Sequence, residues 1–513
     1  MRLHQGHGHQ AFVDRRRGRA QEAGLVCFSL LFQQGISSLA RKPSTPVQDG
    51  PAFLTGSTLR HVVVMSTTGA LGLVAIFLVD LANLFYISLL GQQELAAAIG
   101  YASTIMFFAV SVCIGFTIAA GALTARAIGS GNERRAKAYA GASLIFMLAV
   151  SIVMAIILYA AIGWSLDLLG AEGRTKEIAA GFMSITIPSV PLLGIGMACS
   201  GLLRAKGDAK RAMYVTLSSG LSAAAFDPLL IFYFDLGVTG AAISVVIVRV
   251  LFVVVGFHGT MRVHDMVRMP NSEELYAFAS PFFRIASPAV LTQVATPVGN
   301  AYVTSAIADF GDDAVAGWAI VGRIIPLAFA AIFALSGAVG PILAQNYGAG
   351  RLDRVNSTMR DSLLFTLVYV IAMWALLALL KTPITLVFSA DGDARQMIEV
   401  FCYLVAGTQI FTGFLFVANA AFNNLDHPVY STFFNWGRAT LGVIPFAHIG
   451  SRWGAEGIII GWGLGGAVFG ILALVACYAV LRRLPGQAAK EGITVYVPPI
   501  ANSPFSSGRG AGL

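Results

Sequence analysis

The sequence predicts an all-α integral membrane protein in which twelve transmembrane helices form two six-helix lobes related by an internal duplication. Of its 513 residues, 56% are hydrophobic and only 12% are charged, against roughly 25% charged in soluble domains. Apolar runs of about 20 residues, long enough to cross a hydrocarbon core of roughly 30 Å as a helix, recur along nearly the whole chain. A repeated sequence pattern, described below, indicates the duplication. The bilayer is therefore the solvent for most of this protein.

The apolar runs, with their Gly, Pro and charged interruptions, place the twelve helices. In chain order their predicted bounds are 62–90, 95–122, 137–161, 176–203, 211–235, 238–258, 278–307, 313–343, 357–381, 395–423, 429–449 and 454–481. Turns at Gly91 and Gly237 separate the first helix from the second and the fifth from the sixth. Prolines inside the fourth, fifth, seventh and eighth helices predict kinks, because each removes a backbone donor. These prolines are Pro188, Pro191, Pro228, Pro288, Pro297 and Pro326.

Short basic clusters follow the second, fourth, sixth, eighth and twelfth helices. The positive-inside rule assigns such loops to the cytoplasm, so both termini are expected there as well. The net charge of +8 is accounted for by these loops, and no nucleic-acid partner is expected. The clustered residues are Arg126, Arg134, Arg135, Lys137, Arg204, Lys206, Lys210, Arg211, Arg262, Arg268, Arg351, Arg354, Arg482 and Arg483.

The predicted domain organisation is a disordered cytoplasmic tail over 1–55, an N-terminal lobe over 56–265, a C-terminal lobe over 266–483 and a cytoplasmic tail over 484–513. In the first tail, a basic run and a short apolar stretch imitate a signal peptide, but no clean small-residue cleavage site follows. The five cysteines are far apart and lack the spacing of a zinc site. We therefore expect no bound cofactor or metal other than a coupling ion.

The two halves of the chain are similar to each other. ARAIGSGNERR, from Ala125, aligns with AQNYGAGRLDR, from Ala344, 219 positions later. The same offset aligns ELAAAIGYASTI, from Glu94, with DAVAGWAIVGRI, from Asp313. A six-helix unit has an even number of crossings, so both copies lie the same way up, with a cleft between them. This plan suits alternating access, in which two bundles rock about a site between them.

Five strings carry a family resemblance over residues 60–483. They are NLFYISLLGQQELAAAIG from Asn83, ALTARAIGSGN from Ala122, LLRAKGDAKRAM from Leu202, DPLLIFYFDLGVTGAAIS from Asp227 and GAVGPILAQNYGAGRLDR from Gly337. In this order they resemble the multidrug and toxic compound extrusion (MATE) family, nearest its prokaryotic DinF-like branch. The resemblance implies a monomeric antiporter in the bacterial inner membrane that exports cationic or amphipathic organic compounds in exchange for H+ or Na+. A lipid-linked oligosaccharide flippase of the same superfamily is the alternative.

Two carboxylates lie within predicted spans, where ionisable residues are costly and usually functional. Asp80 precedes the Gly91 turn and Asp227 precedes the Gly237 turn by similar numbers of residues, so both are expected at similar depth in the N-terminal lobe. Asp227 matches the acid of the family's Asp-Pro motif. In the first span the resemblance places an Asp where this chain has Asn83, and Asp80 lies three residues earlier on the same helix face. We interpret Asp227, Asp80 and Asn83 as cation-coupling residues; hydrogen bonding between helices is the alternative.

The resemblance and the expected depths also suggest cavity residues. Tyr86 could hold an organic cation through its ring, and Ser200 lies where the family often has another polar residue near the end of the fourth span. Arg249 is expected level with Asp227 across a helical hairpin, either paired with it or facing the cavity. The seventh span offers Gln293 and Asn300, where the NorM branch has carboxylates for Na+. These amides favour a proton-driven site in the N-terminal lobe.

Other classes of protein fit less well. No HExxH, GxSxG or Walker motif indicates an enzyme, and no selectivity-filter string indicates a channel. A flippase would require a broadly basic cavity, for which Arg249 and Arg323 are the arginines available in the central spans. The expected partners are therefore small organic cations or amphipathic drugs and the lipid bilayer.

Overall fold

The computed structural model describes residues 51–89 and 93–496; over 80–89 and at 93, 94 and 96 it describes the helix but not the side chains. Most of both predicted tails therefore lies outside the described residues. The described part of the first half forms eight α-helices, and short 3₁₀ or π turns extend several of them. They are α2 (Thr58–Leu89), α3 (Gln93–Gly129), α4 (Glu133–Ala160), α5 (Ile162–Leu168), α6 (Gly173–Thr186), η1 (Ile187–Ser189), α7 (Val190–Lys206), α8 (Ala209–Pro228), η2 (Leu229–Tyr233), α9 (Gly237–Phe257) and η3 (His258–Val263).

The second half repeats this series. It consists of α10 (Ser272–Ala308), α11 (Asp312–Ala328), α12 (Ala330–Gly348), α13 (Leu352–Val387), α14 (Gly392–Tyr403), η4 (Val405–Thr408), α15 (Gln409–Asn424), α16 (Pro428–Gly437), η5 (Arg438–Gly442), α17 (Val443–Gly450), η6 (Ser451–Trp453) and α18 (Ala455–Lys490). Each of the twelve predicted spans appears as one helix or as a broken series of helices. Within the described part of the chain, nine helical spans are long and apolar enough to cross a membrane, and α11 with α12, bent by 47°, makes a tenth.

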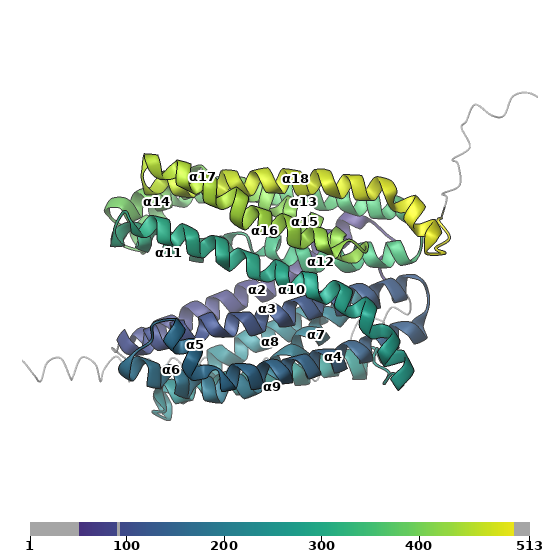
Figure 1. Cartoon of the computed structure of the whole chain (residues 1–513), viewed down its shortest axis with the longest axis horizontal. Helices are drawn as coiled ribbons and strands as arrows, with labels where there is room; N and C mark the ends of the chain where they lie inside the picture. The colour runs from purple at the N-terminus through teal and green to yellow at the C-terminus, as the bar shows by residue number, and fades with distance from the viewer. Residues whose placement is uncertain (1–50, 90–92, 497–513) are drawn as a thin grey trace, which may run out of the picture.

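Helix boundaries repeat with the offset of 219 residues that the sequence predicts. The α3 range, 93–129, becomes 312–348, which is the combined range of α11 and α12; the start of α7 at 190 becomes 409, the start of α15. Figure 1 shows the two halves as separate lobes, α2–α9 in purple and blue and most of α10–α18 in green and yellow. The predicted fold class is confirmed.

Helices are interrupted at several of the prolines that were predicted to kink them. The 3₁₀ turn η1 contains Pro188 and separates α6 from α7, and the π turn η2 begins directly after Pro228. Pro326 lies two residues before the end of α11, at the bend into α12. In contrast, α10 is assigned as one continuous helix through Pro288 and Pro297. The helix α18 extends to Lys490, beyond the predicted end at 481, because Leu481, Leu484 and Ala488 remain buried against the C-terminal lobe.

Two helices pass from one lobe to the other. The helix α2 begins in the core of the C-terminal lobe, where Val62 and Met65 are buried, and ends against α8, where Gly220 contacts Ala75. The helix α10 begins in the core of the N-terminal lobe, through Phe282 and Ala286, and ends in that of the C-terminal lobe. Figure 1 shows α10 crossing the molecule diagonally. Each lobe is therefore completed by the first helix of the other half.

The lobes meet at the end of the molecule that carries the basic loops, which we call the basic end; toward the other end their helices diverge (Figure 1). Arg126, at the end of α3, donates to Asp426 at 2.6 Å, and Gln345, its equivalent in the second repeat, donates to the carbonyl of Ala205 at 2.6 Å. The backbones also approach closely here: a Cβ on Gly129 would lie 2.0 Å from the carbonyl oxygen of Gln345. The donors of these two cross-lobe bonds thus occupy equivalent positions in the repeat.

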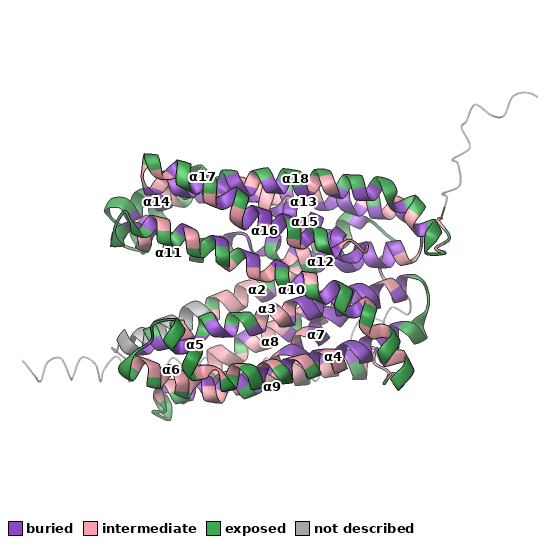
Figure 2. Cartoon of the chain, viewed as in Figure 1, coloured by how far each residue is buried: buried purple, intermediate pink, exposed green. Residues whose placement is uncertain are grey.

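Buried residues follow the helix faces that point into each lobe, as Figure 2 shows. Large apolar side chains also lie on the outer surface, among them Leu379 and Val387 on α13, each about 80% exposed. An apolar outer surface of this kind would aggregate in water, and it suits a protein surrounded by lipid.

Candidate functional site

The Asp-Pro pair near the end of α8 forms the centre of the candidate site. Asp227 is buried, with 3% of its surface exposed. Pro228 ends the regular α-helix, since it has no N–H to continue the hydrogen-bond series, and the five-residue π turn Leu229–Tyr233 follows. Such π turns are frequent at functional sites because they reposition the side chains beside them. Local backbone chemistry therefore fixes where this carboxyl group lies.

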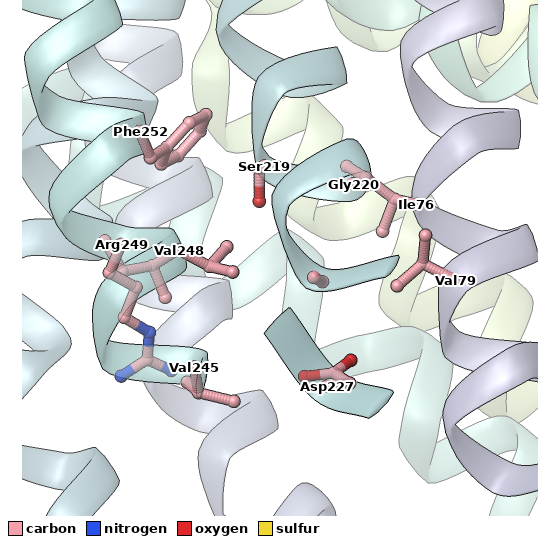
Figure 3. Close-up of a pocket in the computed structure, with 11 residues that line it drawn as sticks. Ile76, Val79, Ser219, Gly220, Asp227, Val245, Val248, Arg249 and Phe252 are labelled. Atoms are coloured by element: carbon pink, nitrogen blue, oxygen red, sulfur yellow. The ribbon is translucent and has the colours of Figure 1, made fainter. Parts of the chain in front are cut away.

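Asp227 lines a cavity of about 170 Å³ inside the N-terminal lobe (Figure 3). The walls come from α2, α7, α8 and α9, and most of the lining is apolar. Among the described side chains, the polar ones in this lining are those of Asp227, Ser219 and Arg249. The volume is smaller than the roughly 300–1,000 Å³ of pockets that bind drug-sized molecules, although it has room for water. In this conformation the cavity suits an ion, a proton or a few waters rather than a drug.

Arg249 is held away from Asp227 by other partners. Its Nη1 donates to the carbonyl of Thr186 and to the hydroxyl of Ser189, both at 2.7 Å. In a regular α-helix the N–H of Val190 would donate to the carbonyl of Thr186. In the 3₁₀ turn Ile187–Ser189 it donates to the carbonyl of Ile187, so the Thr186 carbonyl accepts from the guanidinium of Arg249 instead. Among the described residues, Arg249 and Asp227 share one cavity but form no ion pair. Of the two expectations for Arg249, the structure places it at the cavity wall.

The structure brings together only some of the predicted site residues. Asp227 and Arg249 line the cavity. Ser200 is buried in α7 and directs its hydroxyl at the carbonyl of Ala212, 3.4 Å away, so it lies outside the cavity lining. Gln293 and Asn300 lie on α10, which supplies no lining residue. The other three candidates, Asp80, Asn83 and Tyr86, fall in the last part of α2, where their side chains lie outside the described residues.

Sequence reasoning missed several cavity residues. Ser219, Gly220 and Ala223 precede Asp227 by eight, seven and four residues and therefore share its helix face. That spacing was the available signal for Ser219. By contrast, Val79 on α2 and Phe252 on α9 come from helices far apart in sequence, and no local pattern assigns them to this wall.

A second buried polar region lies in the C-terminal lobe. Arg438, 7% exposed, begins the π turn η5 and donates from Nη2 to the hydroxyl of Thr296 on α10 at 2.9 Å. It forms no ion pair with any described residue. Nearby, the amide of Asn435 donates to Asn419 at 3.0 Å. At the position where the N-terminal repeat has Ser219, the C-terminal repeat thus carries a buried cation.

Comparisons with known proteins agree with this architecture. A family model described as MatE matches residues 70–229 and 288–449, two ranges displaced by nearly the repeat offset. The chain is 26% identical over 446 residues to a Shewanella oneidensis protein named FAD transporter, covering 85% of this chain and 97% of that one. It is also 26% identical over 347 residues to the Staphylococcus aureus multidrug export protein MepA, covering 65% and 75%.

Solved structures show the same fold. A mutant of the Vibrio cholerae MATE transporter VcmN superposes with a TM-score of 0.78 at 23% identity, covering 83% of this chain and 97% of that one. A MATE structure in complex with MaL6 superposes with a TM-score of 0.80 at 20% identity, covering 86% and 100%. At these identities the superpositions establish the arrangement of the helices.

Proposed function

Because this chain belongs to the MatE family of membrane transporters, we propose that it is a secondary active antiporter that exports organic compounds in exchange for protons, with Asp227 as the coupling group. The observation that carries the proposal is a carboxyl group buried in a small, mostly apolar cavity at membrane depth. An ionisable residue in such a place is costly unless it has a function. Export of drugs is supported by the similarity to the multidrug export protein MepA.

The mechanism follows from the two lobes and their closed basic end. The positive-inside rule assigns the basic end to the cytoplasm, so the present arrangement is closed inside and its helices diverge outside. A proton entering from outside would neutralise Asp227 and lower the cost of burying it. Loss of the proton after the lobes rock would restore the charge. The proton and the exported compound would then favour different conformations, which is the requirement for exchange.

Coupling to H+ rather than Na+ is favoured by the few oxygen ligands on the described cavity wall. Among the described lining side chains, those with oxygen atoms are Asp227 and Ser219. In the C-terminal lobe, Arg438 provides a buried positive charge and no described carboxylate pairs with it. A proton requires only the carboxyl group itself, whereas a sodium ion requires several oxygen ligands around it.

The same arginines favour one alternative substrate class. Arg249, half-buried at the cavity of the N-terminal lobe, and Arg438, buried in the C-terminal lobe, place one cation inside each lobe, and the relative from Shewanella oneidensis is named FAD transporter. An anionic compound of the flavin nucleotide class is therefore the second candidate cargo. The flippase alternative also requires a basic site, and the similarity to the protein named FAD transporter favours the nucleotide cargo over it.

Transport by reconstituted vesicles tests the proposal. Inverted vesicles containing wild type, Asp227→Asn or Asp235→Asn are energised and assayed for uptake of ethidium and, separately, of FAD, with a protonophore or a sodium ionophore added. Asp235 is a matched control, because it is exposed near the end of the same span and its φ of 52° is one that asparagine adopts.

We expect Asp227→Asn to show no more uptake than empty vesicles and Asp235→Asn to retain uptake. The protonophore should abolish uptake by wild type, whereas the sodium ionophore should not. Uptake of FAD without uptake of ethidium would assign the second cargo. Sensitivity to the sodium ionophore alone, or full activity of Asp227→Asn, would refute proton coupling through this residue.

A further inference from the structure

A second cavity lies at the basic end, beside the place where the lobes meet. Its volume is about 580 Å³, and it is lined by α10, by the turn between α15 and α16, and by the last three turns of α18. Its charged lining residues are Arg284, Asp426, Arg483, Lys490 and Glu491, with His427 beside them. No step of the proposed transport cycle uses this cavity.

The acids of this cavity are already satisfied, whereas the bases are not. Arg126 donates to Asp426 at 2.6 Å and to Glu491 at 3.4 Å. Glu491 also accepts hydrogen bonds from the Tyr347 hydroxyl at 3.1 Å and from Gln487 at 3.0 Å. In the described part of the chain, Arg284, Arg483 and Lys490 form no ion pair. Together with Arg126, these three cations outnumber the two carboxylates by two charges, an excess that attracts an anion.

These cations stand on both lobes. Arg284 lies on the first half of α10, whose neighbouring residues Phe282 and Ile285 belong to the core of the N-terminal lobe. Arg483 and Lys490 lie on α18, whose residues Leu481 and Leu484 belong to the core of the C-terminal lobe. An anion bound between them would therefore connect the lobes next to the Arg126–Asp426 bond.

The surface above the cavity is apolar and faces outward. On α18, Ala479 and Leu472 precede Arg483 by four and eleven residues, on the same helix face, and both are exposed. On α10, Leu291 follows Arg284 by seven residues, on the same face, and is 52% exposed. An apolar stripe on α18 and an exposed leucine on α10, each in line with an arginine at the basic end, match an amphipathic ligand with acyl chains in the bilayer and a charged head at the interface.

We propose that this cavity binds the phosphate of an anionic phospholipid, held between Arg284 on α10 and Arg483 and Lys490 on α18, with the acyl chains along Leu291 and the stripe of Leu472. Basic pockets between membrane helices on the cytoplasmic side are suited to such head groups. The bound lipid stabilises the arrangement in which the basic end is closed, since separating the lobes would separate its ligands. This second statement rests on the proposed alternating-access function, whereas the binding itself does not.

Binding is tested without transport. The purified full chain is equilibrated with mixed micelles containing equal amounts of phosphatidylglycerol and phosphatidylcholine, and the lipids retained are counted by native mass spectrometry. The variant combines Arg284→Gln, Arg483→Gln and Lys490→Gln. Arg482→Gln is the matched control, because this residue is exposed, adjacent in sequence and absent from the cavity lining. Thermal unfolding in phosphatidylcholine confirms that each variant is folded.

We expect wild type and Arg482→Gln to retain phosphatidylglycerol in preference to phosphatidylcholine. Each neutralised cavity charge should lower the affinity for phosphatidylglycerol about fivefold. Equal loss in Arg482→Gln, or no preference in wild type, would overturn the site. Displacement of phosphatidylglycerol by millimolar inorganic phosphate or glycerol 1-phosphate would assign a soluble phosphate ligand and overturn the assignment to lipid.

A separate distance measurement tests whether the bound lipid stabilises the closed basic end. Spin labels at Arg134→Cys and Arg360→Cys, exposed positions at the basic end of each lobe, report the separation of the lobes. Phosphatidylglycerol should increase the short-distance population in wild type but leave the triple variant unchanged. Lipid binding without a change in the distance distribution would refute the effect of the lipid on conformation. The Asp227→Asn variant should lose transport and still give the lipid-retention and distance results of wild type.

Discussion

At the scale of single residues, the sequence predicted Asp227 and Arg249 as charged groups within spans but missed Arg438 and the partners of Arg249. Asp227 and Arg249 were expected level with each other, and the structure places both at one cavity. The bonds of Arg249 to Thr186 and Ser189 were not expected, because they depend on a carbonyl made available by the 3₁₀ turn at Pro188. A long side chain with several rotatable bonds can reach any of several acceptors, and sequence spacing does not choose among them.

Asp208, in the turn between α7 and α8, gives a prediction at this scale. Burial alone would raise the pKa of its carboxyl group, but hydrogen bonds with His264 and with Arg211 hold that pKa at about 2, below the ordinary value of 3.8. The charged form therefore stabilises the folded state by about 2 kcal/mol, fully above the ordinary value and progressively less as the pH falls toward 2.

Asp208→Asn removes this charge and retains a residue able to cap α8. We expect the variant to unfold at a lower temperature than wild type at pH 6–8, by a constant margin, and the margin to shrink below about pH 4. Thermal unfolding followed by tryptophan fluorescence in detergent measures both. A margin that stays constant down to pH 3 would contradict the assigned stabilisation.

At the scale of elements, glycine spacing explains how α18 packs. A Cβ on Gly461 would lie 2.2 Å from the carbonyl oxygen of Phe446, and one on Gly465 would lie 2.1 Å from that of Gly442. A Cβ on Gly466 would contact nothing within 4 Å. The small residues at four-residue spacing therefore allow α17 and α18 to approach backbone to backbone, as small-xxx-small spacings do in membranes.

A pair of adjacent substitutions tests this packing. Gly465→Ala should destabilise the protein by about 1–3 kcal/mol, because Gly442 ends the π turn η5, which continues directly into α17, and its carbonyl cannot move aside without shifting both. Gly466→Ala should be neutral or slightly stabilising, since alanine favours the helix. The thermal unfolding midpoints of the two variants, compared with wild type, measure the difference; equal midpoints would show that α17 moves freely.

At the scale of the whole molecule, the sequence predicted the two lobes but not the exchange of α2 and α10 between them. The 219-residue repeat and the hydrophobic runs determine the number, order and direction of the helices. They do not determine which lobe each helix packs against, because an apolar helix in lipid can pack on any complementary surface. The exchange depends on fitted contacts such as Tyr139 with Phe278, which are 139 residues apart.

The bonds at the basic end give a prediction about the whole molecule. Arg126→Gln removes the charged bond from α3 to Asp426, while Arg351→Gln removes a bond to Asp353 within one lobe and serves as the control. The Arg126 pair is partly buried, so its loss should cost the closed arrangement about 1 kcal/mol, or about fivefold in its ratio to the open one.

Spin labels at Arg134→Cys and Arg360→Cys detect this change as a larger long-distance population in Arg126→Gln than in Arg351→Gln. The four described native cysteines are buried, so replacement of Cys27 by serine completes the background. Identical distance distributions in the two variants would show that the Arg126 bonds do not hold the lobes together.

The exchange of α2 and α10 also affects biosynthesis. The surface of α3 that α10 covers is complete only after residues 272–308 leave the ribosome, on the order of ten seconds after α3 itself. During that interval the first half of the chain holds an unfilled helical groove in the membrane, and the early part of α2 has no core to join. The two halves of the chain therefore cannot fold as two independent events.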